Sequence, residues 1–251
     1  MIQIPKRLGK EPLIEAIWQL EFEPEANQSV GDLLPGVMFS TLRKQHPGLK
    51  LHRLPNADIP PQIAQNDPNL RNAPKHRMSD EDSPFLYQVG DRVITVNCRI
   101  PYVGWSAFKD KILQVIDVVQ GSGFVPNPQR HALRFIDLLT LDAPPDLTSL
   151  RLKLDVGDFS IQRTPLQMRL ELQEKDTVHI VQIVTPAQVT IPTKTQDGTI
   201  VDIETYEKLP PQSWEVVKEQ LDKLHERSKL MFFGNILTKE AIDRMEPEYW
   251  K

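Results

Sequence analysis

Cysteine is almost missing from this chain of 251 residues, whose single example is Cys98. An intrachain disulfide and a metal site built from several cysteines are therefore excluded, and we expect a reducing, cytoplasmic location. Cys98 alternates with Ile94, Val96 and Ile100, which is typical of a buried strand. No base that could take the thiol proton stands beside it, so the pattern favours a structural cysteine over a nucleophile.

Long apolar runs are missing as well. No stretch of about 18 or more apolar residues occurs, so the sequence predicts no membrane-spanning helix. Near the N-terminus, Glu11 and Glu15 interrupt the apolar residues that a signal peptide would need, so we expect none. With 39% hydrophobic and 25% charged residues, the chain has the composition of a globular protein with a buried core.

Basic charge is not in surplus, because 30 lysines and arginines stand against 34 acidic residues. Proteins that hold nucleic acids through phosphate contacts usually carry an excess of positive charge. The balance argues against such binding over the whole surface and leaves room for a local basic patch. Lys75, His76 and Arg77 form one candidate patch, shortly before the acidic residues 80–82.

The usual catalytic and cofactor motifs are absent. The sequence contains no GxxxxGK, GxGxxG, HExxH or GxSxG pattern, and its six histidines lack the spacing of metal ligands. Residues 106–109 match the SxxK pattern of penicillin-binding enzymes, but none of that family's other motifs follows. We therefore predict no catalytic residue, no metal and no cofactor, and the pattern favours a protein that is not an enzyme.

The spacing of apolar residues predicts an α+β fold with an antiparallel sheet, because several strands alternate between apolar and polar residues. Strands are expected at 12–22, 49–54, 129–142, 150–156, 166–173, 178–184 and 200–206, with a hairpin at 85–100. Helices are expected at 29–46, 105–120 and 214–233 and after Thr238. Residues 186–199 are expected to form a proline-bearing loop.

Residues 55–84 differ from the rest of the chain. They contain six prolines and show no sustained period of 2 or 3.6 residues. Loops of this length are uncommon and are usually functional or disordered. An ordered loop of this kind must be held by its own chain, by a twin subunit or by a partner, and self-packing is the simplest of the three.

The two long helices match each other at a constant offset of 109 residues. The matched positions are Pro101, Trp105, Phe108, Lys109, Ile112, Val115 and Val119, over Pro210, Trp214, Val217, Lys218, Leu221, Leu224 and Ser228. We interpret the match as a duplicated sheet-plus-helix unit, with helices on one face and halves at 1–128 and 129–251. The alternative is chance, since any two amphipathic helices share spacings of three and four residues.

The stretch QRHALRFIDLLTLD, residues 129–142, is predicted to open the second half. Arg134 and Asp137 point to opposite faces of this strand, and a buried charge needs a partner. Arg134 could face an anionic ligand and Asp137 could cap a helix. Alternatively, Arg134 or His131 pairs with Glu15 or another acid. We take His131, Arg134 and Asp137 as candidate binding residues.

Phe232 and Phe233 end the last long helix and could contribute to an apolar groove or a dimer face, although packing in the helix core is the simpler interpretation. Adjacent positions of an α-helix cannot both face one core. One of the two rings is therefore expected to contact the terminal helix or another chain.

Five stretches together resemble a sporadically distributed bacterial family of about this length, over residues 11–245. They are PLIEAIWQLEF, GDRVITVN, YVGWSAF, HALRFIDLL and LDKLHERSKLMFFGNILTKEAIDRME. In that family Asn often stands at the position of Asp137. The family has no assigned activity and no agreed catalytic residues, so the resemblance implies none. Its patchy distribution resembles that of defence or toxin–antitoxin modules, which is an analogy only.

Three functions are compatible with the sequence. The first is a non-catalytic interaction subunit of a bacterial accessory or defence-type module, which binds a co-encoded partner protein or a second copy through residues 55–84 or the C-terminal helices. The second is a nucleic-acid-binding protein that uses the sheet or residues 75–77. The third is a small-molecule-binding protein or enzyme with a cavity between sheet and helix near Arg134.

Overall fold

The structure is a computed structural model that describes residues 3–25, 28–191 and 194–249. The chain divides into two compact units, which we call unit 1 and unit 2. Unit 1 contains residues 1–14, 134–206 and 223–251, and unit 2 contains residues 15–133 and 207–222. The boundary falls inside the central strand and inside the last long helix, so each of these two elements belongs partly to each unit.

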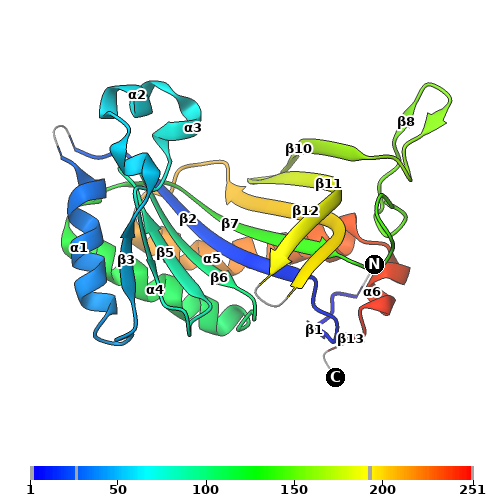
Figure 1. Cartoon of the computed structure of the whole chain (residues 1–251), viewed down its shortest axis with the longest axis horizontal. Coiled ribbons are helices and arrows are strands. Elements are labelled where there is room, and N and C mark those ends of the chain that lie inside the picture. Colours follow the sequence, from blue (N-terminus) through cyan, green and yellow to red (C-terminus); the bar gives the residue numbers. More distant parts are fainter. Residues whose placement is uncertain (1–2, 26–27, 192–193, 250–251) are drawn as a thin grey trace. The chain divides into compact units, whose positions relative to one another are not determined.

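The sheet of unit 2 has the strand order β7-β2-β6-β5-β4-β3 (Figure 1). Its strands are β2 (Leu13–Phe22), β3 (Lys50–Arg53), β4 (His76–Ser79), β5 (Phe85–Val89), β6 (Val93–Arg99) and the first part of β7 (Pro128–Leu139). The pairs from β2 to β3 are antiparallel. The predicted hairpin at 85–100 is confirmed as β5 and β6.

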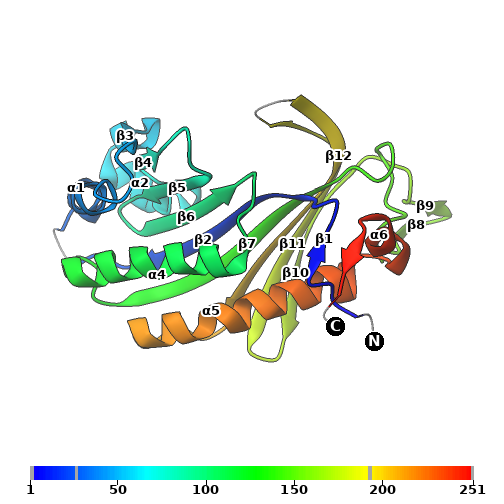
Figure 2. The same ribbon diagram turned by 90° about the horizontal axis from the view of Figure 1, so that it is seen from below.

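Helices α1 (Val30–Leu42) and α4 (Trp105–Ser122) cover one face of this sheet, and Figure 2 shows α4 running along β2 and β6. The apolar residues of α4 matched in the sequence are buried from Phe108 to Val119 at spacings of three and four, whereas Trp105 in the first turn is half-buried. Every second residue of β2 from Ala16 to Phe22 is buried, including Trp18 with none of its surface exposed. Burial of one such large side chain contributes about 1.5–3 kcal/mol.

Residues 55–84 are more regular than the sequence predicts. They form η1 (Pro55–Asp58), α2 (Pro61–Asn66), α3 (Pro68–Arg71) and strand β4. Prolines begin all three of these helices, at positions where the missing N–H has no partner to lose. The loop is closed by its own backbone, because the N–H of Leu54 donates to Lys75 O (2.8 Å) and that of Lys75 donates to Val89 O (2.8 Å).

The sheet of unit 1 has the order β10-β11-β12-β7. Its strands are β10 (Leu166–Glu174), β11 (Thr177–Ile191), β12 (Lys194–Glu207) and the second part of β7. Smaller pairs join β1 (Arg7–Leu8) to β13 (Pro247–Glu248) and β8 (Asp155–Val156) to β9 (Phe159–Ser160). The antiparallel α+β fold is therefore confirmed, with β10 and β11 paired from Leu166↔Thr185 to Glu174↔Thr177.

One strand prediction and one loop prediction in unit 1 are wrong. Residues 150–154 alternate in sequence, but they form a loop with one isolated bridge between Leu150 and Leu237. Residues 186–199, expected as a loop, continue β11 and β12 on both sides of the undescribed positions 192–193. Proline is tolerated there because the pairing with β10 ends at Thr185, so Pro186 lies where β11 has a neighbour on one side only.

The C-terminal part of unit 1 comprises the last turns of α5 (Trp214–Lys229), the π-helix η2 (Leu230–Ile236) and α6 (Lys239–Arg244). Thr238 caps α6 as predicted, since its Oγ1 accepts from the N–H of Ala241 at 3.1 Å. The rings of Phe232 and Phe233 lie 5.0 Å apart, and both pack against the same core. The expectation that adjacent rings could not share a core is wrong, because it assumed the spacing of an α-helix. The core that they share includes Ile242 of the terminal helix α6.

Among the described residues, no helix is both long enough and apolar enough to cross a membrane.

Candidate functional site

Arg134 is held inside unit 1 by an acid of the neighbouring strand. Its Nε donates to Asp202 Oδ1 at 2.8 Å, and a second guanidinium nitrogen donates to the other oxygen, which makes the pair bidentate. Asp202 is 6% exposed. The partner is therefore Asp202 and not Glu15, which instead accepts from Asn97 Nδ2 at 2.8 Å.

His131 is a buried, neutral side chain of unit 2. Its Nε2 donates to Gln220 Oε1 at 2.8 Å, so its Nδ1 is free to accept from Trp18 Nε1 at 3.4 Å. Burial is the main reason why the pKa of His131 is lowered to about 4. The arrangement is structural, because neither ring nitrogen is left for a ligand.

Asp137 is the most deeply buried acid among the candidates, at 5% exposure. Burial raises its pKa well above the usual value, and the nearby charges of Glu11 and Asp202 act in the same direction. Such a carboxyl group favours its protonated form, which sets it apart from a metal-binding carboxylate. Among the residues that the structure describes, no three His, Cys, Asp or Glu side chains are grouped so that they could hold a metal ion.

The three basic residues 75–77 do not form one patch. Lys75 is buried and forms an ion pair with Asp91 at 2.8 Å. His76 is half-buried and Arg77 is exposed, and these two alternate along β4. Only Arg77, opposite His52 of β3, faces solvent fully, so nucleic-acid binding through this cluster stays a prediction that rests on few charges.

Lys75 nevertheless lines a cavity of about 440 Å³ in unit 2. Residues 56–75, which include the short helices, form one side of it, and Figure 1 shows α2 and α3 at one end of the unit 2 strands. The opposite side consists of residues 23–25 after β2, residues 28–32 at the start of α1, and the β5–β6 turn at 91–92. The unusual loop is therefore the wall of a pocket, which we call the loop pocket.

The basic groups of the loop pocket are already paired with its own acids. Lys75 pairs with Asp91, while Arg71 (3.3 Å) and Arg92 both pair with Glu23. Among the described residues of the cavity lining, these are the three cations. An anionic ligand would have to compete with these internal pairs, which makes a negatively charged ligand unfavourable here.

The loop pocket also contains hydrogen-bond acceptors that have no partner among the described residues. Glu25 and Asp32 are exposed acids at the edge of the cavity, and the described residues show no partner for either side chain. Asp91 Oδ1 and Gln28 Oε1 are buried without a hydrogen-bond partner in the part of the chain that the structure describes. Unpaired buried acceptors are rare in proteins, and together with two spare carboxylates they favour a ligand that donates hydrogen bonds and carries positive charge.

One close contact sets the position of the loop against the sheet. A Cβ built on Gly90 would lie 2.5 Å from Ala73 O, which is a backbone atom that cannot move aside cheaply. We expect Gly90→Ala to lower the free energy of unfolding by about 1–3 kcal/mol through overpacking. Urea unfolding measures this, with Gly36→Ala as the control, since a Cβ there meets nothing within 4 Å and is expected to raise stability by up to about 1 kcal/mol.

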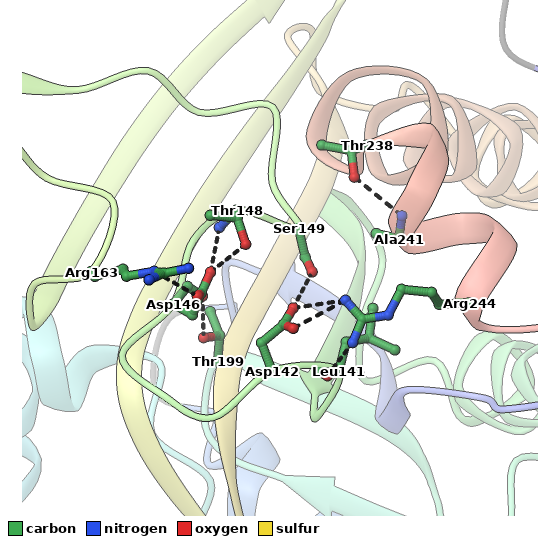
Figure 3. Close-up of polar contacts among 10 residues, drawn as sticks. All are labelled: Leu141, Asp142, Asp146, Thr148, Ser149, Arg163, Thr199, Thr238, Ala241 and Arg244. Atoms are coloured by element: carbon green, nitrogen blue, oxygen red, sulfur yellow. Dashed lines mark hydrogen bonds and ion pairs between the residues drawn. The ribbon is translucent and has the colours of Figure 1, made fainter.

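A second polar cluster, in unit 1, is complete without a ligand (Figure 3). Asp142 accepts from Arg244 (3.0 Å) and from Ser149 Oγ (2.9 Å), and Arg244 also donates to the carbonyl of Leu141. Asp146 accepts from the N–H and hydroxyl of Thr148 and pairs with Arg163. These bonds lower the pKa of both carboxyls, chiefly through Arg244 for Asp142 and Thr148 for Asp146. The cluster fixes the loop after β7 to α6.

No protein-family model matches this chain, and no curated protein matches it. The resemblance to a bacterial family therefore stays a prediction. Of the predicted site residues, the structure places only Lys75 at the loop pocket. Sequence reasoning missed Glu23, Asp32 and Asp91, because these acids come from three separate segments that meet only in the folded chain.

Proposed function

We propose that this protein is a non-catalytic interaction protein that binds a cationic group of its partner, a lysine or arginine side chain, in the loop pocket. The observation that carries the proposal is the imbalance of the pocket: its three cations are paired internally, whereas Glu25, Asp32 and one oxygen of Asp91 have no partner among the described residues. In this proposal, part of the segment 55–84 forms one side of the binding site. The proposed function is compatible with a subunit of an accessory module.

The dimensions of the loop pocket support a side chain or small cation as the occupant. Its volume of about 440 Å³ lies at the lower end of the range of about 300–1,000 Å³ for sites that take small molecules. Ile59 and Leu70 also line the pocket, and their apolar side chains can pack against the methylene groups of a lysine or arginine. A free polyamine shares this chemistry, and a comparison of probes distinguishes it from a protein side chain.

The test uses full-length protein and capped tripeptides Ala-Lys-Ala, Ala-Arg-Ala and Ala-Glu-Ala, with spermidine as the free cation. Amide chemical shifts followed by NMR report where each probe binds. We expect the cationic peptides to shift signals of residues 28–32 and 91–92, and the acidic peptide to leave them unchanged. Stronger binding of spermidine than of either peptide would favour a small-molecule carrier over an interaction protein.

Asp32→Asn is expected to weaken binding of the cationic peptides about tenfold, since a charge-assisted bond contributes about 1.5–3 kcal/mol and a change of 1.4 kcal/mol is tenfold. Asp110→Asn is the matched control, because Asp110 is an exposed acid on α4 outside the pocket. Titration of both variants under the same salt conditions checks the prediction. Equal affinities for the two variants, or preferential binding of the acidic peptide, would contradict the proposal.

A further inference from the structure

Within the described residues, no strand pairs with the outer edge of β10. It is the last strand in the sheet order, and β11 is its partner on the other side. None of its nine residues is buried, and the six from Arg169 to Glu174 are all exposed. An exposed edge of this length presents a row of free N–H and C=O groups that can pair with another strand.

The two faces of β10 differ in chemistry. Leu166, Met168, Leu170 and Leu172 lie on one face, and Gln167, Arg169, Glu171 and Gln173 lie on the other. Leu170 and Leu172 are each 37% exposed, and both line a groove of about 410 Å³ with Leu152, Met231 and Ile236. The apolar layer of unit 1 thus extends to the outer edge and is not fully covered there.

The sequence of β10 is complementary to itself. If two copies pair antiparallel about a two-fold axis through Leu170, Arg169 of each copy stands opposite Glu171 of the other, which gives two cross-strand ion pairs on the polar face. On the apolar face Met168 stands opposite Leu172, and Leu170 meets its own copy. From this charge and apolar complementarity we infer that β10 is a self-association edge, at which a second copy of this chain continues the sheet.

The charges also select the register. With the axis moved to Arg169, that residue would face its own copy, and with the axis moved to Glu171, two carboxylates would face each other. Like charges opposite each other on neighbouring strands are destabilising. Among the nearby registers that keep the apolar residues on one face, the pairing about Leu170 is therefore the favourable one.

The inference concerns unit 1 and is independent of the loop pocket in unit 2. It is tested by sedimentation velocity of the full chain at micromolar to hundred-micromolar concentrations. We expect a concentration-dependent dimer in the wild type. Arg169→Glu and Glu171→Arg should each weaken the dimer about tenfold or more, because each turns two attractive pairs into two repulsive ones. Lys153→Glu, an exposed charge reversal of unit 1 outside β10, is the control and should leave the dimer unchanged.

Mixing the two single variants is the decisive experiment. In the mixed dimer, the glutamate introduced by Arg169→Glu in one chain would face the arginine introduced by Glu171→Arg in the other, so both cross-strand pairs become attractive again. We expect the mixture to form dimers at concentrations at which each variant alone is monomeric. A wild type that stays monomeric at about 100 µM, or a mixture that stays monomeric although both variants keep the wild-type circular dichroism, would overturn the inference.

Discussion

His131→Gln is expected to abolish a contribution of about 3 kcal/mol by which His131 lowers the free energy of unfolding of the wild type between pH 6.5 and pH 4. Burial lowers the pKa of His131 from 6.5 to about 4 in the folded chain. In that window the unfolded chain binds a proton that the folded chain does not, so stability falls as the pH falls. The difference between 6.5 and about 4 corresponds to about 3 kcal/mol for this nearly fully buried group.

The geometry around His131 explains why the proton is rejected. Trp18 Nε1 is a donor that points at Nδ1, so a protonated ring would place two N–H groups against each other. The neighbouring charge of Arg130 lowers the pKa of His131 further. A glutamine cannot take up a proton in this range, and its amide can still donate to Gln220.

Urea unfolding at a series of pH values measures the effect. His52→Gln is the control, because it makes the same substitution at an exposed position on β3, away from the buried core. His179, with a pKa also lowered by burial, and Asp137, with a raised pKa that acts in the opposite direction, remain in the variant. The contribution of His131 is therefore the difference between the pH dependences of the variant and the wild type. The pKa values of Asp142 and Asp146 are lowered, so their contribution to stability is lost only below pH 3.8, outside the range of this experiment. An unchanged slope in His131→Gln would refute the assignment.

Elements whose side chains alternate between core and solvent were predictable from the sequence. The buried stripe of α4 appears because the period of the residues is the period of the backbone. In β10 the same rule gives an apolar and a polar face, although only Leu166 and Met168 pack against the core. The same rule misled at residues 150–154, where alternate leucines contact the core from a loop that is held by the bridge from Leu150. Periodicity detects burial on one side, and it does not distinguish a strand from an extended loop that covers a core.

The candidate site was much less predictable than the fold. Lys75 drew attention as part of a basic cluster, but its importance comes from a buried pair with Asp91. The walls of the loop pocket come from four segments that meet only in the folded chain. Prolines at the starts of η1 and α2 hid the regular structure of residues 55–84, because in sequence a proline at a helix start and a proline in a turn look alike.

Asp137→Asn is expected to stabilise the protein at neutral and alkaline pH, and it is the clearest test of the buried acid in β7. Burial raises the pKa of Asp137 well above 3.8, with the charges of Glu11 and Asp202 adding to the effect. Between the two pKa values the folded chain keeps a proton that the unfolded chain has released, so stability falls as the pH rises through this range. Asparagine cannot ionise, so the variant should not share this loss.

Thermal unfolding at several pH values from about 5 to 9 tests this prediction, and the gain in melting temperature should grow with pH. Asp117→Asn is the control, because Asp117 is an exposed acid of α4 paired with Lys218, and surface pairs of this kind contribute about 0–1 kcal/mol. A variant that is less stable than the wild type at every pH would mean that the carboxyl group of Asp137 makes a bond that an amide cannot replace. A gain that grows with pH would show that the charge alone is costly at this position.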